Sequence, residues 1–174
     1  MNELSPTPSQ TVGPFFHFAL DYAGGAQLVP GHHPDAIVLH GTVFDGSAAA
    51  VPDALIEIWQ TDAAGEVPRR LGSLDRDAIS FTGFGRACTN RAGDYVFTTV
   101  RPGSGFLTLA VFARGLSHHL FTRAYLDDGA DDPLLRSLAA NRRGTLVAAK
   151  DAPASYRFDI RLQGENETVF LEYR

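Results

Sequence analysis

The strongest constraint on the fold of this chain is an apolar run over residues 106–113. It follows the turn sequence Pro102-Gly103-Ser104-Gly105 and ends at Arg114. A short run rich in Leu, Val and Phe between glycines is typical of a strand buried on both faces. The arginine that follows has two interpretations: a solvated strand end, or an anion-binding group at the rim of a cleft.

Composition places the chain among ordinary globular proteins. Its 174 residues are 44% hydrophobic and 20% charged, which suffices for one domain with its own core. The net charge of −5 disfavours a nucleic-acid partner. Residues 1–10 lack the pattern of a signal peptide, and no apolar run reaches the length of a membrane span. We therefore expect a cytoplasmic protein that does not contact membranes.

Several further segments have the composition or alternation of strands. Residues 94–100 alternate, and we expect them to form a hairpin with 86–89 across 90–93. Residues 121–126 are expected to pair with the 106–113 strand. The other predicted strands are 37–44, 54–60, 157–162 and 167–173. Many short strands with little helix predict an all-β fold, a single-domain β-sandwich.

The remaining segments complete the predicted domain, which spans residues 1–174. Three prolines favour an extended arm over residues 1–16, ahead of a sandwich over 37–173. Residues 65–85 have no lasting period and predict a long surface loop. Asp132 before Pro133 predicts the N-cap of one short helix of about two turns.

Catalytic and metal-binding motifs are scarce. The chain has no Gly-x-Ser-x-Gly sequence, and its single cysteine, Cys88, is interpreted as a small core residue. Neighbouring histidines on extended backbone point to opposite faces, which disfavours a self-contained metal site. The histidines are His17, His40 and the pairs His32-His33 and His118-His119.

Family motifs nevertheless cover most of the chain. The segment Glu57-Ile58-Trp59-Gln60-x-Asp62 resembles the intradiol ring-cleavage dioxygenases, as do 39–43, 86–89 and 93–103. Within that family, residues 7–15, 112–116, 122–125 and 156–170 resemble the α chains of protocatechuate 3,4-dioxygenases. The resemblance implies a prealbumin-like β-sandwich of the intradiol dioxygenase type.

The resemblance also implies where iron would be bound. The family holds a non-haem Fe(III) through two tyrosines and two histidines, and uses O2 to open an ortho-diphenol ring. The two histidine positions correspond here to Phe106 and Thr108, and one tyrosine position falls at Ser104-Gly105. The other falls in the 65–86 loop, which contains no tyrosine. We therefore expect no metal and no catalytic residue in this chain, and Fe(III) in a partner β chain.

The α chains of this family line the substrate cleft of the β chain. Carried over by motif, the substrate-binding residues are Thr11, Gly13, Pro14 and Arg114. A planar guanidinium is a good partner for the carboxylate of protocatechuate, and a glycine lets a ring approach the backbone closely. The alternative for residues 11–14 is an arm that only packs.

Three functions follow from these observations. The first is the α subunit of a protocatechuate 3,4-dioxygenase, acting in an αβ hetero-oligomer with protocatechuate and O2. The second is a non-catalytic prealbumin-like scaffold or small-ligand carrier. The third is an enzyme with a different metal, bound by His17, His40 and the His118-His119 pair.

Overall fold

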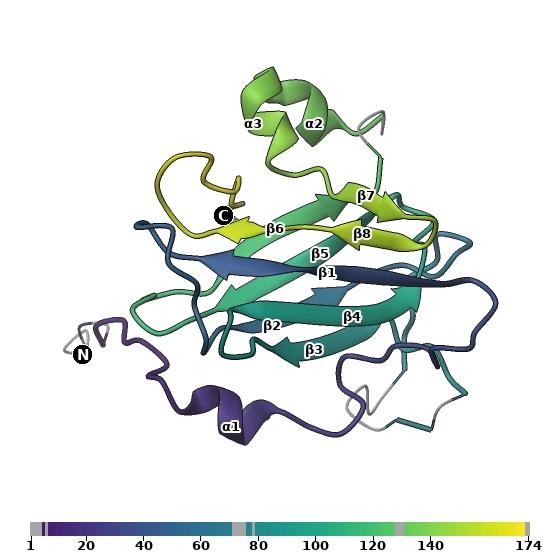
Figure 1. Cartoon of the computed structure of the whole chain (residues 1–174), viewed down its shortest axis with the longest axis horizontal. Helices are drawn as coiled ribbons and strands as arrows, with labels where there is room; N and C mark the ends of the chain where they lie inside the picture. Colours follow the sequence, from purple (N-terminus) through teal and green to yellow (C-terminus); the bar gives the residue numbers. More distant parts are fainter. Residues whose placement is uncertain (1–4, 6, 71–75, 78, 128–130, 173–174) are drawn as a thin grey trace.

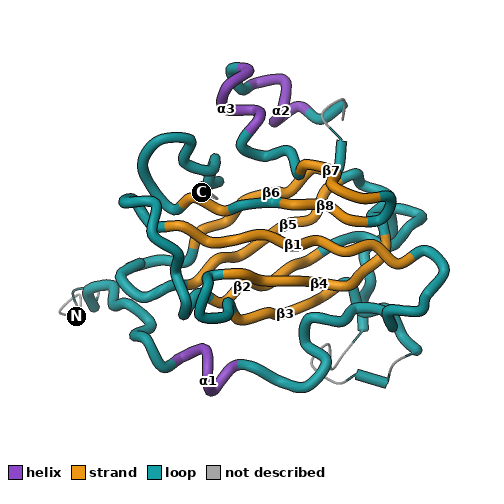
Figure 2. Tube along the Cα trace, in the orientation of Figure 1, coloured by secondary structure: helices purple, strands orange, loops and turns teal. Residues whose placement is uncertain are grey.

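A computed structural model describes residues 5, 7–70, 76–77, 79–127 and 131–172. Two β-sheets pack face to face, with short helices at the periphery (Figures 1 and 2). The strands are β1 (Ala36–Phe44), β2 (Leu55–Trp59), β3 (Phe84–Cys88), β4 (Asp94–Val100), β5 (Phe106–Phe112), β6 (Leu120–Tyr125), β7 (Ala149–Ala152), β8 (Ser155–Arg157) and β9 (Ile160–Arg161). The helices are α1 (Phe16–Leu20), α2 (Pro133–Ser137) and α3 (Ala140–Gly144). The expected β-sandwich is confirmed.

The two sheets divide the strands unequally. One sheet has the order β4-β1-β8-β7, with β9 also paired to β1, and the other has the order β3-β2-β5-β6. β5 lies between β2 and β6 and is antiparallel to both. The predicted pairing of 121–126 with the 106–113 strand is therefore confirmed.

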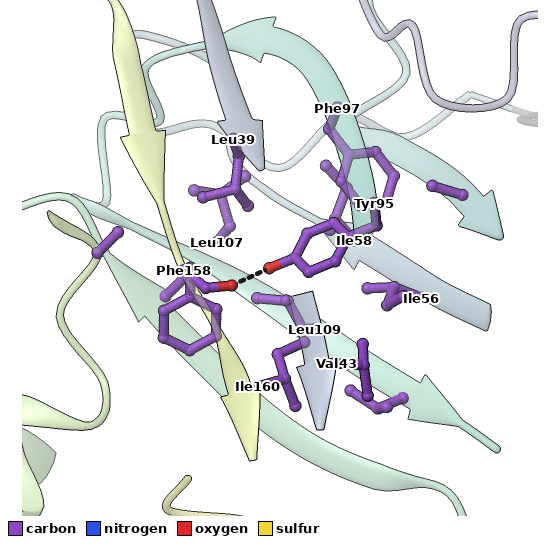
Figure 3. Packing of buried hydrophobic residues seen from close by; sticks show 14 of the residues in the cluster. Leu39, Val43, Ile56, Ile58, Tyr95, Phe97, Leu107, Leu109, Phe158 and Ile160 are labelled. Atoms are coloured by element: carbon purple, nitrogen blue, oxygen red, sulfur yellow. Dashed lines mark hydrogen bonds between the residues drawn. The ribbon is translucent and has the colours of Figure 1, made fainter. Parts of the chain in front are cut away.

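The core lies between the sheets and contains side chains from both (Figure 3). The hydroxyl of Tyr95 lies in this core and donates a hydrogen bond of 2.6 Å to the carbonyl oxygen of Phe158. Burial raises the pKa of this phenol. A Cβ at Gly41 would lie 2.0 Å from the same carbonyl oxygen, so only glycine fits where β1 passes this segment.

The predicted hairpin over 86–100 is wrong. β3 pairs with β2 and β4 pairs with β1, so the 90–93 turn crosses from one sheet to the other. The turn itself forms as expected, because Asn90 Oδ1 accepts hydrogen bonds from the backbone N–H groups of Ala92 and Asp94. Alternation fixed which residues face the core, but it carried no information about the pairing partner.

The C-terminal strands also differ from expectation. The predicted strand over 157–162 is two short strands, β8 and β9, because the backbone leaves the β1 ladder at Phe158 and Asp159. Its apolar residues still face the core, and β7 is an additional strand with all four residues exposed. The predicted strand over 167–173 is reduced to an isolated bridge between Leu171 and Phe121, and residue 173 lies outside the described part.

The predicted strand at 106–113 forms as β5 but is not buried on both faces. Leu107, Leu109 and Val111 are fully buried, whereas Phe106, Thr108 and Phe112 are half-buried on the outer face.

One helix was expected, and three short helices are present. α2 confirms the expectation: Pro133 begins it, and the Asp132 carboxylate accepts a 2.8 Å hydrogen bond from the N–H of Leu134. α1 and α3 consist of exposed or half-buried residues, so they have no apolar stripe that a sequence pattern could reveal. No helix among the described residues is long and apolar enough to cross a bilayer.

Candidate functional site

The register between β2 and β5 brings Arg114 to a buried carboxylate. Leu55 pairs with Phe112, so the antiparallel ladder continued by two residues places Asp53 opposite Arg114. The Arg114 Nε and Asp53 Oδ2 atoms are 3.2 Å apart. The arginine side chain is 59% exposed, whereas that of Asp53 is 8% exposed. Arg114 thus lies just beyond β5, with its Nε in an ion pair with Asp53 and more than half of its side chain open to solvent.

The N-terminal arm runs to the same end of the sandwich as the β5–β6 turn (Figure 1). A small groove of about 170 Å³ separates them, lined by Gln10 and Val12 of the arm and by residues of the turn that include Ala113 and Leu116. Ser9 Oγ lies 3.2 Å from His118 Nε2 and ties the arm to the turn. We call this end, formed by residues 9–14 and 113–119, the arm end.

The three predicted arm residues have distinct conformations. Thr11 Oγ1 accepts a hydrogen bond from the N–H of Gly13 at 3.4 Å, which forms a local turn. Gly13 has a φ of +73°, in the left-handed region that favours glycine, and a Cβ there would have no heavy atom within 4 Å. Pro14 is exposed and precedes α1. The backbone at Gly13 is therefore open to an approaching ring, and glycine is also required by its conformation.

The positions that correspond to the family's histidine ligands lie at the start of β5, at the opposite end of the sandwich. The Phe106 ring packs against Tyr125, with centroids 5.2 Å apart, and the Arg123 guanidinium carbon lies 4.2 Å from the Phe106 ring centroid. Arg123 Nη1 is 3.2 Å from Asp132 Oδ2. A phenyl ring offers no donor atom, and a guanidinium in this place repels a metal cation. These residues do not fit a ferric ion.

The turn before β5 packs closely against the 61–65 turn. Ser104, at one tyrosine position, donates its hydroxyl hydrogen to the carbonyl oxygen of Phe106 at 3.1 Å. The N–H of Gly103 donates to Asp62 O at 2.8 Å, and a Cβ on Gly103 would lie 2.4 Å from the nitrogen of Gly65. We call this region, formed by residues 102–108 and their neighbours in the 61–65 turn, the closed end.

A cavity of about 1140 Å³ was not predicted from the sequence, and its lining includes the closed-end residues Ala63, Pro102 and Gly103. Its walls include Leu28, Val29, Phe81, His32 and Arg101, which come from three separate loops and therefore leave no joint sequence pattern. Arg101 is already hydrogen-bonded to the hydroxyl of Tyr156 and paired with Asp127.

The histidines do not converge. His40 on β1 pairs with Asp151 at 2.8 Å, His17 lies in α1, and His118 and His119 lie in the β5–β6 turn. Within the described part of the chain, no group of three or more His, Cys, Asp or Glu residues is placed to hold a metal ion. The structure therefore gives no support to the alternative of a different metal.

Asp53 is a residue that the sequence interpretation did not select. The available signal was the antiparallel pairing of the 54–60 and 106–113 segments, which predicts its position opposite Arg114 once the register is known.

Comparisons with known proteins show the family of this chain. The family described as Dioxygenase (Dioxygenase_C) matches residues 26–107. The chain is 39% identical to a protocatechuate 3,4-dioxygenase alpha chain of Burkholderia cepacia, over 99% of this chain and 100% of that one. It is 38% identical to the alpha chain of Pseudomonas putida, over 98% of each. The beta chain of Burkholderia cepacia is 26% identical, over 77% of this chain and 67% of that one.

Solved structures show the same fold. The dioxygenase domain of a carbohydrate-binding fusion protein from Streptomyces sp. SirexAA-E superimposes with a TM-score of 0.58 at 23% identity, covering 92% of this chain and 99% of that one. Catechol 1,2-dioxygenase from Acinetobacter sp. ADP1 gives a TM-score of 0.55 at 20% identity, over 85% of this chain and 60% of that one. With near-complete coverage by the alpha-chain relatives, the chain belongs to the intradiol ring-cleavage dioxygenase family, in its protocatechuate 3,4-dioxygenase α-chain branch.

Proposed function

We propose that this chain is the α subunit of a protocatechuate 3,4-dioxygenase. In the αβ assembly, a β chain holds Fe(III) and cleaves protocatechuate with O2 between its two hydroxyl carbons, giving 3-carboxy-cis,cis-muconate in aromatic catabolism. The α chain contributes one wall of the cleft through Thr11, Gly13, Pro14 and Arg114. It carries no metal and no catalytic residue of its own.

The observation that carries this proposal is the arrangement of the arm end. Arg114 is 59% exposed, and the arm that bears Thr11, Gly13 and Pro14 reaches the same end of the sandwich. A guanidinium at the same end of the sandwich as an open stretch of backbone suits a ring that carries a carboxylate, because the guanidinium can bind the carboxylate while the ring packs on the arm. The full-length identity to alpha chains supports the same role.

The closed end supports the assignment of iron to the partner. Phe106 and Ser104 replace donor residues with a ring and a turn-forming hydroxyl, and Arg123 places a cation over the Phe106 ring. A hard ferric ion needs oxygen and imidazole donors, so a β chain must supply them.

Co-expression tests this function directly. The purified chain alone is expected to be colourless, iron-free and inactive. Co-expressed with a protocatechuate 3,4-dioxygenase β chain, it should yield a coloured complex that consumes O2 when protocatechuate is added. An active, iron-loaded chain without a β partner would overturn the proposal. A stable homo-oligomer that never co-purifies with a β chain would support the scaffold or ligand-carrier alternative instead.

A further inference from the structure

The Arg114 guanidinium has two hydrogen-bonding edges, and Asp53 contacts the one that bears Nε. The Nε–Oδ2 distance is 3.2 Å, and the side chain as a whole remains 59% exposed. The two terminal nitrogens therefore form a second edge that can donate two parallel hydrogen bonds to a carboxylate. We propose that Asp53 is a positioning residue, which holds the Nε edge of Arg114 so that its terminal edge faces the substrate carboxylate. This inference rests on the proposed function.

Hydrogen bonds to Thr89 fix the backbone that carries the Asp53 carboxylate. The Thr89 hydroxyl donates to the carbonyl oxygen of Val51 at 2.8 Å and accepts from the N–H of Ala54 at 3.0 Å. The N–H of Thr89 in turn donates to the carbonyl oxygen of Ala54 at 2.9 Å. These bonds fix the backbone on both sides of Asp53, so its carboxylate can orient a long and otherwise mobile side chain.

The buried charge of Asp53 is compensated by the Arg114 guanidinium. Its carboxylate is more than nine-tenths buried, and its Oδ1 atom meets no hydrogen-bond donor among the described residues. A buried carboxylate is costly unless a cation compensates it, so the pair resists separation. The exposed arginine is thereby restrained before substrate arrives, and less of its rotational freedom is lost on binding.

The test uses the αβ complex and the variant Asp53→Asn, which preserves shape and removes the charge. We expect KM for protocatechuate to rise about fivefold, while kcat and iron content stay at wild-type values, because only the orientation of Arg114 is lost. With catechol, which has no carboxylate, the KM of the variant should equal that of the wild type. A purely structural role would change both substrates alike.

Glu57→Gln serves as a matched control. Glu57 lies four residues away, and its Oε1 accepts two hydrogen bonds from Arg86, so this change also removes one half-buried negative charge from an arginine pair. It should leave the ratio of the two KM values unchanged. An unchanged protocatechuate KM in Asp53→Asn, with a raised KM in Arg114→Ala, would overturn the inference but leave the proposed function intact. An unchanged KM in Arg114→Ala would remove the substrate role of Arg114 itself.

Arg114→Lys provides an independent test if Asp53→Asn does not fold. A lysine ammonium paired with Asp53 has no second planar edge to offer, so KM for protocatechuate should rise about tenfold although the charge is kept. A wild-type KM in this variant would contradict the two-edge arrangement.

Discussion

Arg114 at the arm end and Arg123 at the closed end each pair with an aspartate at 3.2 Å, yet they lie in opposite surroundings. Arg123 is 26% exposed, and its guanidinium interacts with the Asp132 carboxylate and with the face of the Phe106 ring, both of this chain. Arg114 is 59% exposed, and its partner Asp53 contacts its Nε atom. Arg123 thus covers the positions that correspond to the family's histidine ligands, whereas the Arg114 side chain remains available to a ligand.

The closed end should tolerate change least. In Gly103→Ala, the new Cβ would lie 2.4 Å from the backbone nitrogen of Gly65, and backbone atoms there cannot move aside as a flexible side chain would. We expect a loss of about 3 kcal/mol in the free energy of unfolding, measured by urea denaturation. Gly144→Ala, whose Cβ would have no heavy atom within 4 Å, is the control and should stay within about 0.5 kcal/mol of wild type. Equal stabilities would show that the two turns are not tightly packed.

Cys88 reports whether α1, which follows the arm, stays on the sandwich. Its Sγ lies 3.4 Å from the carbonyl oxygen of His17, and burial raises the pKa of the thiol to about 11. At pH 8 the thiolate should be about 100-fold scarcer than for a free cysteine, so alkylation by iodoacetamide should be slower by that factor. Because the deprotonated form reacts, the rate should rise with pH up to about 11. Reaction at the rate of the urea-unfolded chain would mean that α1 is not docked.

Arg114→Ala tests whether the arm end contributes to substrate binding. In the αβ complex we expect KM for protocatechuate to rise about 30-fold, because a charge-assisted contact to the substrate carboxylate is lost. Iron content and kcat should be unchanged. Steady-state kinetics and metal analysis on one preparation check both points, and a parallel loss of iron would show that Arg114 acts through the assembly instead.

Gly13→Ala should have the smallest effect. Alanine is strained at a φ of +73°, by about 1 kcal/mol, so the arm would shift locally while the fold stays intact. We expect KM for protocatechuate to rise about fivefold with little change in melting temperature. Gly31→Ala, which meets open space without a left-handed φ, should leave both quantities unaltered. If Gly13→Ala matches that control, the arm only packs.

Local sequence patterns predicted most of the fold, and non-local contacts account for the rest. Alternation in residues 94–100 identified β4 and its core-facing side chains, and Asp132 with Pro133 identified α2. The same alternation could not show that β3 and β4 belong to different sheets, because either pairing buries the same residues. α1 and α3 lack a buried stripe and so leave no periodic signal.

The candidate site was predictable to a similar degree. Motifs selected Arg114 and the arm, and they showed that Phe106 and Thr108 cannot serve as imidazole ligands. The contribution of Asp53 required the register of β2 against β5. The Arg123 guanidinium over Phe106 required the pairing of β5 with β6, which aligns Phe106 with Tyr125 and Thr108 with Arg123.

The most direct test of the account is the position of iron in crystals of the αβ complex, measured by anomalous diffraction at the iron edge. We expect one iron peak for each αβ pair, ligated by the β chain and facing the arm end of this chain, beside Arg114. A peak next to Phe106 and Thr108, or one that lies far from both the arm and Arg114, would contradict it.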